Sequence, residues 1–171
     1  MSERQLPVKI NALRLTEQHA RLTGALAIDE MPRLLPMLGN AIGRVAIDLA
    51  FDVDSEGLPV IKGQVDATLN LICQRCLQLV EYVIDDECLL SPITKLEQAD
   101  QLPEAYEPVL IEGEEQLLAA LVEDELILRL PIVAMHEPEE CGIKVPKAEL
   151  PELKTVRKNP FDALKKLKKE E

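Results

Sequence analysis

Residues 44–53 read Arg-Val-Ala-Ile-Asp-Leu-Ala-Phe-Asp-Val, and this stretch decides the fold class. Large apolar side chains occupy the odd positions, whereas Arg44, Asp48 and Asp52 fall on even ones. A period of two places successive side chains on opposite faces of a strand. The pattern therefore predicts a half-buried strand of an antiparallel sheet, with one face in the core and one in water.

The residues that follow predict partner strands for this one. Residues 54–57 (Asp-Ser-Glu-Gly) are typical of a turn. Alternation resumes over residues 65–71, and a further alternating stretch covers residues 77–84. Gly63 interrupts the apolar phase and predicts a β-bulge. We expect these strands to form the centre of the sheet.

The remaining strands and short helices have weaker signals. Short strands are expected over residues 8–10 and 22–28, and a short proline-limited helix over residues 30–38. The acidic, proline-punctuated segment 85–108 is expected to be mostly loop, with a helical turn near residues 96–99.

One substantial helix is predicted over residues 114–130. Its apolar residues have helical spacing: Leu117, Leu118, Leu121, Val122 and Leu126. We expect Glu114, Glu115, Glu123 and Glu125 to be exposed, with Asp124 able to face the sheet. The run 123–125 also raises the alternative of a carboxylate or hard-cation site, but consecutive helical residues point in different directions, so a solvated face is favoured.

The order of these elements predicts an α+β fold. The sheet is expected to be antiparallel and strongly twisted or barrel-like, and covered by one main helix with short extra helices. Residues 1–150 are expected to form a single domain, followed by a basic, flexible tail over residues 151–171.

Composition restricts the classes of function. The 171 residues carry a net charge of −12, with 17 acidic and 2 basic residues in the acidic stretch, residues 81–140. There are only four aromatic residues and no Trp, which argues against a surface that stacks unpaired bases. No apolar run is long enough to span a membrane, and the first residues lack the features of a secretory signal. We therefore expect a cytoplasmic protein whose cysteines are thiols or metal ligands.

Two reactive clusters stand out in the chain. Cys73-Gln-Arg-Cys76 lies between two expected strands, as in a zinc knuckle, whereas a thioredoxin-like redox motif opens a helix. Together with His136 and Cys141 the pair predicts a structural zinc site of three thiols and one imidazole, closed to further ligands. The alternative is a polar surface histidine and isolated cysteines. Cys88 is interpreted as a small buried hydrophobic residue.

Four stretches of the chain carry a family resemblance: Leu-Ile-Cys-Gln-Arg-Cys at 71–76, Leu-Pro-Glu-Ala-Tyr-Glu-Pro at 102–108, Val-Glu-Asp-Glu-Leu-Ile-Leu at 122–128 with Leu-Pro at 130–131 and His136 to Cys141, and Asn-Pro-Phe at 159–161. In this order they resemble the bacterial YceD family, the large ribosomal RNA subunit accumulation proteins. The resemblance implies a non-enzymatic role in the accumulation or processing of large-subunit (23S) ribosomal RNA during ribosome biogenesis.

The charge distribution suggests two ways in which the chain could bind precursor particles of the large ribosomal subunit. The basic tail can contact precursor RNA through seven residues: Lys154, Arg157, Lys158, Lys165, Lys166, Lys168 and Lys169. Alternatively, the acidic stretch recruits a basic ribosomal protein and no RNA is touched. A metal-dependent hydrolase is disfavoured because three thiolates and an imidazole leave no open coordination position. We therefore expect a protein that is not an enzyme.

Overall fold

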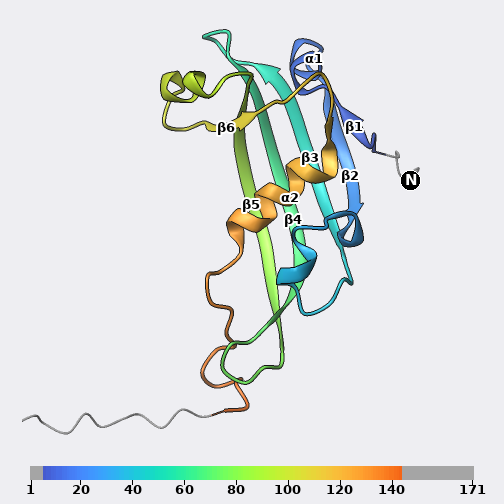
Figure 1. Ribbon diagram of the computed structural model, residues 1–171, viewed down its shortest axis with the longest axis vertical. Helices are drawn as coiled ribbons and strands as arrows, with labels where there is room; N and C mark the ends of the chain where they lie inside the picture. Colours follow the sequence, from blue (N-terminus) through green and yellow to red (C-terminus); the bar gives the residue numbers. More distant parts are fainter. Residues whose placement is uncertain (1–5, 144–171) are drawn as a thin grey trace, which may run out of the picture.

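The computed structural model describes residues 6–143 (Figure 1). Its main feature is a five-stranded sheet with the spatial order β2-β3-β4-β5-β6. The strands are β2 (Arg21–Ala27), β3 (Arg44–Val53), β4 (Pro59–Ile72), β5 (Leu79–Ile93) and β6 (Glu107–Leu110). The first four pair antiparallel, and β6 adds to β5 in parallel. The α+β prediction is confirmed.

The barrel-like form of the sheet is not observed. β2 and β6 are its two ends, and they do not pair with each other. The sheet therefore stays open, and its core lies between one face and the helices that cover it.

Strand β3 has the predicted alternation. Val45, Ile47, Leu49 and Phe51 are buried, and the residues between them are exposed or half-buried. Strand β4 does not contain the predicted bulge at Gly63, because Gly63 pairs in continuous register with β3 on one side and β5 on the other. A Cβ at this position would overlap the Leu49 side chain and lie 3.0 Å from the Cys88 sulfur. The glycine is thus explained by close packing.

The segment 85–108, predicted to be mostly loop, lies mostly in regular secondary structure. β5 continues to Ile93, the expected helical turn is a 3₁₀ helix (η3, Leu96–Gln101), and β6 follows. In β5, acidic residues such as Asp85 and Glu87 occupy the exposed face, and Ile84 and Leu90 are buried on the opposite face. The high acidic content of this segment is therefore compatible with a strand, although it suggested a loop.

The smaller elements cover the edge of the core. β1 (Lys9–Ile10) pairs with β7 (Gln116–Leu117), and α1 (Ala12–Glu17) was missed by the sequence interpretation although Asn11 provides a side-chain cap. The expected helix over residues 30–38 is replaced by two 3₁₀ turns, η1 (Ile28–Glu30) and η2 (Leu35–Met37). Two prolines in this segment prevent a continuous helix.

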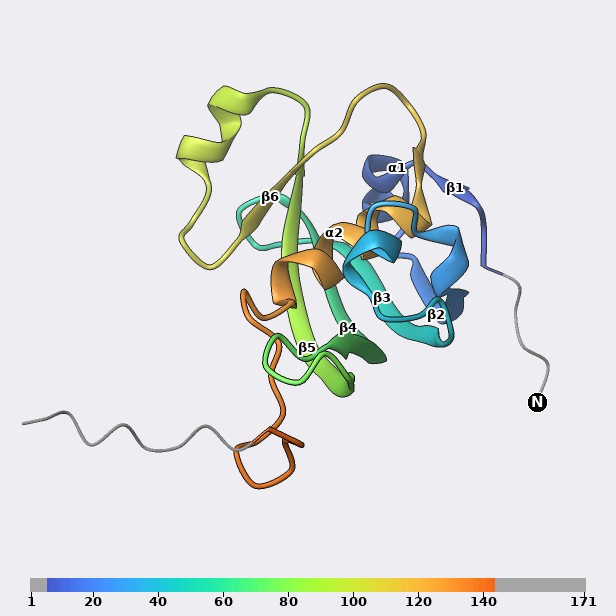
Figure 2. The ribbon, with the colours of Figure 1, turned by 60° about the horizontal axis from the view of Figure 1, so that its bottom comes forward.

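Helix α2 (Leu118–Arg129) lies across one face of the sheet (Figures 1 and 2). It starts four residues later than predicted, because residues 116–117 form β7. Its apolar stripe is buried, as expected, at Leu118, Leu121, Val122 and Leu126. Leu117, predicted as part of the same stripe, lies in β7 instead and is 49% exposed. Within residues 6–143, no helix is both long and apolar enough to cross a membrane.

The prediction that Glu123 and Glu125 are exposed is wrong, because both are buried. The carboxylate of Glu123 accepts hydrogen bonds from the backbone N–H groups of Arg33 and Leu34 and from the Arg33 guanidinium, at 2.9 Å for Nε. Asp124, which was expected to be able to face the sheet, is exposed instead and also pairs with Arg33. Glu123 and Asp124 therefore hold the segment after η1 against α2, and the buried Glu123 is not part of a solvated face.

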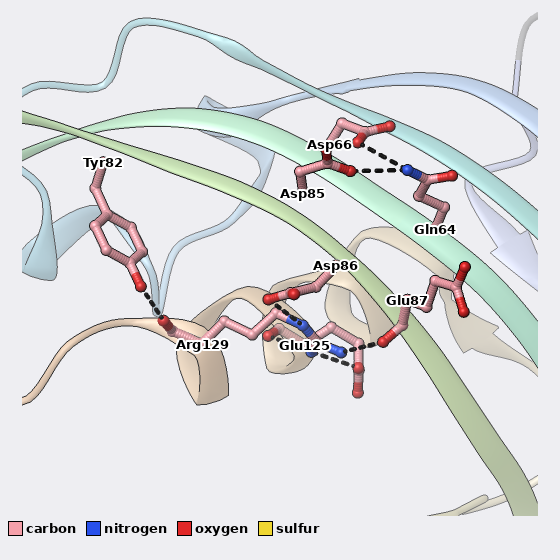
Figure 3. A network of polar contacts seen from close by, with 8 residues as sticks. All are labelled: Gln64, Asp66, Tyr82, Asp85, Asp86, Glu87, Glu125 and Arg129. Carbon is pink, nitrogen blue, oxygen red and sulfur yellow. Dashed lines mark hydrogen bonds and ion pairs between the residues drawn. The ribbon is translucent and has the colours of Figure 1, made fainter.

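Arg129 joins the end of α2 to strand β5 (Figure 3). Its guanidinium donates to the Glu125 carboxylate at 2.7 Å and to the Glu87 carbonyl at 3.1 Å, and lies 3.5 Å from the Asp86 carboxylate. The Tyr82 hydroxyl donates to the Arg129 carbonyl at 3.2 Å. Burial raises the pKa of Glu125 above its usual value, although Arg129 opposes this. The network fixes where the chain leaves α2 and heads toward residues 131–143.

The expected domain boundary at residue 150 and the basic tail 151–171 lie outside the described residues. They stay predictions.

Candidate metal centre

The first arm of the candidate metal centre is the turn between β4 and β5. The Cys73 N–H donates to the Gln78 carbonyl and the Leu77 N–H donates to the Cys73 carbonyl, both at 2.9 Å. Leu77 adopts a left-handed conformation with φ of 59°. This tight turn directs the Cys73 and Cys76 sulfurs to the same side, as predicted for a knuckle between two strands.

The second arm is the segment that follows α2. The Gln74 N–H donates to the Ala134 carbonyl at 2.8 Å, which lays this segment beside the turn. The His136 N–H points at the Cys73 sulfur, 3.5 Å away. A further turn, in which the Cys141 N–H donates to the Glu137 carbonyl at 3.1 Å, brings Cys141 back toward the hairpin.

The four predicted ligands meet. The Cys73, Cys76 and Cys141 sulfurs and a ring nitrogen of His136 all lie within 4.8 Å of one another. Cys73 and Cys141 are buried, and the other two are half-buried. The predicted pairing of two clusters 60 residues apart is therefore correct in space, and the alternative of a surface histidine with isolated cysteines is wrong.

The imidazole of His136 is oriented by a backbone carbonyl. Nε2 lies 2.9 Å from the Leu79 carbonyl oxygen, and Nδ1 lies 3.4 Å from the Cys76 sulfur. Because a carbonyl only accepts, Nε2 is the donating ring nitrogen, and Nδ1 faces the sulfurs. A histidine that binds a metal usually donates its other N–H in this way. Sequence reasoning missed the role of Leu79, since a backbone acceptor leaves no signal in residue type.

Electrostatics within the cluster favours one thiolate and opposes the next. Burial disfavours the Cys73 thiolate, but backbone N–H groups of Cys76, His136 and Arg75 outweigh it and lower the pKa of Cys73 to about 5. At Cys76 a backbone hydrogen bond from Gln78 favours the thiolate. Burial and the sulfurs of Cys73 and Cys141 outweigh this bond and raise the pKa of Cys76. A bound cation would offset the repulsion between several thiolates at such short range.

The donor set fits one ion type well. Three thiolates and one imidazole are a composition of structural zinc sites, which are tetrahedral and hold no water. Such a set can hold two chain segments together, and it offers no position for a substrate. The arrangement is suited to shaping the protein around it.

The other predicted candidates lie elsewhere. Cys88 is buried under α2 and is not part of the cluster, and burial raises its pKa to about 11, so the interpretation as a hydrophobic core residue is confirmed. The seven RNA-binding candidates, from Lys154 to Lys169, lie outside the described residues.

Comparison of the sequence with known proteins identifies a family. Residues 61–168 match the family described as large ribosomal RNA subunit accumulation protein YceD. The chain belongs to the YceD family. A YceD protein of Haemophilus influenzae, described as a large ribosomal RNA subunit accumulation protein, is 35% identical over 173 residues, which cover 98% of this chain and 99% of the relative. The resemblance stated for the four stretches is confirmed. No solved structure matches the chain.

Proposed function

We propose that this chain is a non-enzymatic factor that promotes the accumulation or processing of large-subunit (23S) ribosomal RNA in the cytoplasm. The observation that carries the proposal is the relative named for this process, which matches along nearly the whole chain. The closed donor set at the hairpin agrees with a role that does not involve catalysis.

The direct test compares cells with and without the gene for this chain. The ratio of mature 23S to 16S ribosomal RNA is expected to fall without it, with longer 23S precursors accumulating, and to recover when the gene is returned. An unchanged ratio and an unchanged precursor profile under slow and fast growth would contradict the proposal.

We further propose that Cys73, Cys76, His136 and Cys141 hold one structural zinc ion. Through their thiolates and imidazole they would bind the ion on all four sides and tie the hairpin turn to the segment after α2. The zinc would stabilise this end of the protein and take no part in a reaction.

RNA contact is assigned to the basic residues between Lys154 and Lys169. Deleting residues 154–171 is expected to weaken binding to precursor large subunits at least tenfold and to flatten the dependence of affinity on salt, because lysine–phosphate contacts release counterions. Binding is measured by sedimentation at several salt concentrations. The matched control keeps the length and replaces the seven lysines and arginines with glutamine. If either variant binds as the full chain does, with the same salt slope, RNA contact lies elsewhere.

A second candidate function is a protein-binding module that recruits a basic ribosomal protein. Asp66 and Asp85 sit directly opposite each other on neighbouring strands, and Gln64 donates to both (Figure 3). A hydrogen bond with Asp85 raises the pKa of Asp66. Like charges placed opposite one another destabilise a sheet, and a basic partner would offset that cost. Crosslinks confined to protein would favour this module, and crosslinks to RNA would favour direct RNA binding.

A further inference from the structure

Next to the candidate metal centre, large apolar side chains are exposed to solvent. We call this set the apolar tip; its members are Leu77, Leu79, Ile132, Val133 and Met135. The exposed fraction of these residues ranges from 48% at Leu79 to complete exposure at Ile132. They come from the two arms of the centre, the hairpin turn and the segment after α2. Scattered exposed apolar residues are common on proteins, but a group rimmed by polar residues marks an interaction site.

Contacts between the two arms place the segments that carry these side chains beside each other. The Gln74 N–H bonds to the Ala134 carbonyl between Val133 and Met135, and the Leu79 carbonyl accepts from the His136 ring. Arg75 Nη2 lies 3.7 Å from the Met135 sulfur. The apolar tip is therefore assembled from segments about 60 residues apart, and it exists only while the two arms are joined.

The rim of the apolar tip is acidic. Glu81, Glu137, Glu139 and Glu140 are exposed in the same two segments. Within the described stretches 72–81 and 131–143, Arg75 is the single lysine or arginine. Such a rim repels phosphate, and the five apolar side chains include no aromatic ring on which a base can stack. Charge and chemistry thus disfavour RNA and favour a basic polypeptide.

We propose that the apolar tip is a docking surface for a partner protein, and that it takes a segment in which apolar side chains are flanked by lysine or arginine. The partner's apolar side chains would cover Leu77 and Val133, and its cations would face the glutamates of the rim. Because the two arms meet at Cys73, Cys76, His136 and Cys141, docking depends on that cluster. This inference rests on the proposed function only for the expectation that the partner belongs to an assembling ribosomal particle.

The test is site-specific photo-crosslinking with benzoylphenylalanine in the full chain, in growing cells. The reactive side chain is placed at position 77 or 133, and a matched control is placed at Leu96 in η3. Leu96 is 69% exposed, and η3, the yellow-green helix, lies at the end of the molecule away from the β4–β5 turn (Figures 1 and 2). One basic protein, resistant to RNase and identified by mass spectrometry, is expected at positions 77 and 133, in at least tenfold higher yield than at position 96.

The identified protein is then purified and titrated with the full chain. The double variant L77S/V133S is expected to weaken its binding at least tenfold, and added salt is expected to weaken wild-type binding. The variant L96S serves as the control and is expected to bind as wild type does. Unchanged thermal unfolding of L77S/V133S shows that the fold is intact, since both residues are exposed.

Other outcomes overturn the proposal. They are adducts with RNA, adducts with a second copy, adducts with residues 144–171 of the same chain, and equal yields at positions 77, 133 and 96. The level of 23S ribosomal RNA in cells lacking the gene reports on the proposed function independently of the crosslinks. A failure of docking and a failure of the proposed function are therefore distinguishable.

Discussion

Replacing Cys73 with serine is expected to abolish metal binding and to unfold the segment after α2 locally. Cys73 is buried at the centre of the cluster and accepts hydrogen bonds from both arms, so the remaining thiols and His136 cannot form a closed site. Structural zinc contributes about 10–16 kcal/mol of binding free energy in small zinc-dependent folds, and that energy is coupled to folding. Zinc content is expected to fall from about one ion per chain to below about a tenth of that.

Hydrogen exchange separates this local effect from global unfolding. Amide protection is expected to be lost over residues 132–141 in C73S and retained in strand β3, which packs in the core far from the turn. The matched control is C88A, which removes a buried thiol outside the cluster and is expected to keep its zinc. If C73S keeps both its zinc and the protection of residues 132–141, the cluster does not join the two arms.

Replacing Arg129 with methionine is expected to destabilise the whole domain by about 3 kcal/mol, because it leaves a buried carboxylate without its partner. The Arg129 side chain is 15% exposed and that of Glu125 is 5% exposed. Asp86 and the Glu87 carbonyl also lose their contacts with the guanidinium (Figure 3). The measurement is urea unfolding of R129M against wild type, analysed by linear extrapolation.

Two further variants isolate the cause of this loss. R21M breaks the Arg21–Asp48 pair, in which both side chains are more than a third exposed, and is expected to cost less than about 1 kcal/mol. The double variant R129M/E125L removes both buried charges and is expected to recover most of the stability. An R129M protein within about 0.5 kcal/mol of wild type would show that the network contributes little to stability.

The parts of the fold that were predictable are those where burial follows sequence period. Val45 to Phe51 alternate because one face of β3 lies in the core, and Cys73 to Cys76 sit between two strands because alternation stops and resumes around them. The meeting of Cys73, Cys76, His136 and Cys141 was predictable because three cysteines and one histidine match a known coordination chemistry, which does not depend on distance along the chain.

The parts that were not predictable depend on tertiary contacts. Glu123 has the residue type of a solvated helix face, but the free N–H groups of Arg33 and Leu34, 90 residues away, bind its carboxylate in the interior. β6 joins the sheet in parallel only after η3 reverses the chain, and no local pattern indicates that direction. Gly63 suggested a bulge because it interrupts the apolar pattern. The structural reason for the glycine is the close packing of Leu49 and Cys88, which the sequence does not show.

Metal content and coordination of the full chain, purified without chelators, test directly whether the cluster holds zinc. We expect about one zinc per chain and an X-ray absorption spectrum with three sulfurs at about 2.3 Å and one nitrogen at about 2.0–2.1 Å, without a water ligand. A fully folded protein without metal, or a zinc ion with an oxygen ligand in an open position, would contradict the claim that Cys73, Cys76, His136 and Cys141 form a closed structural site.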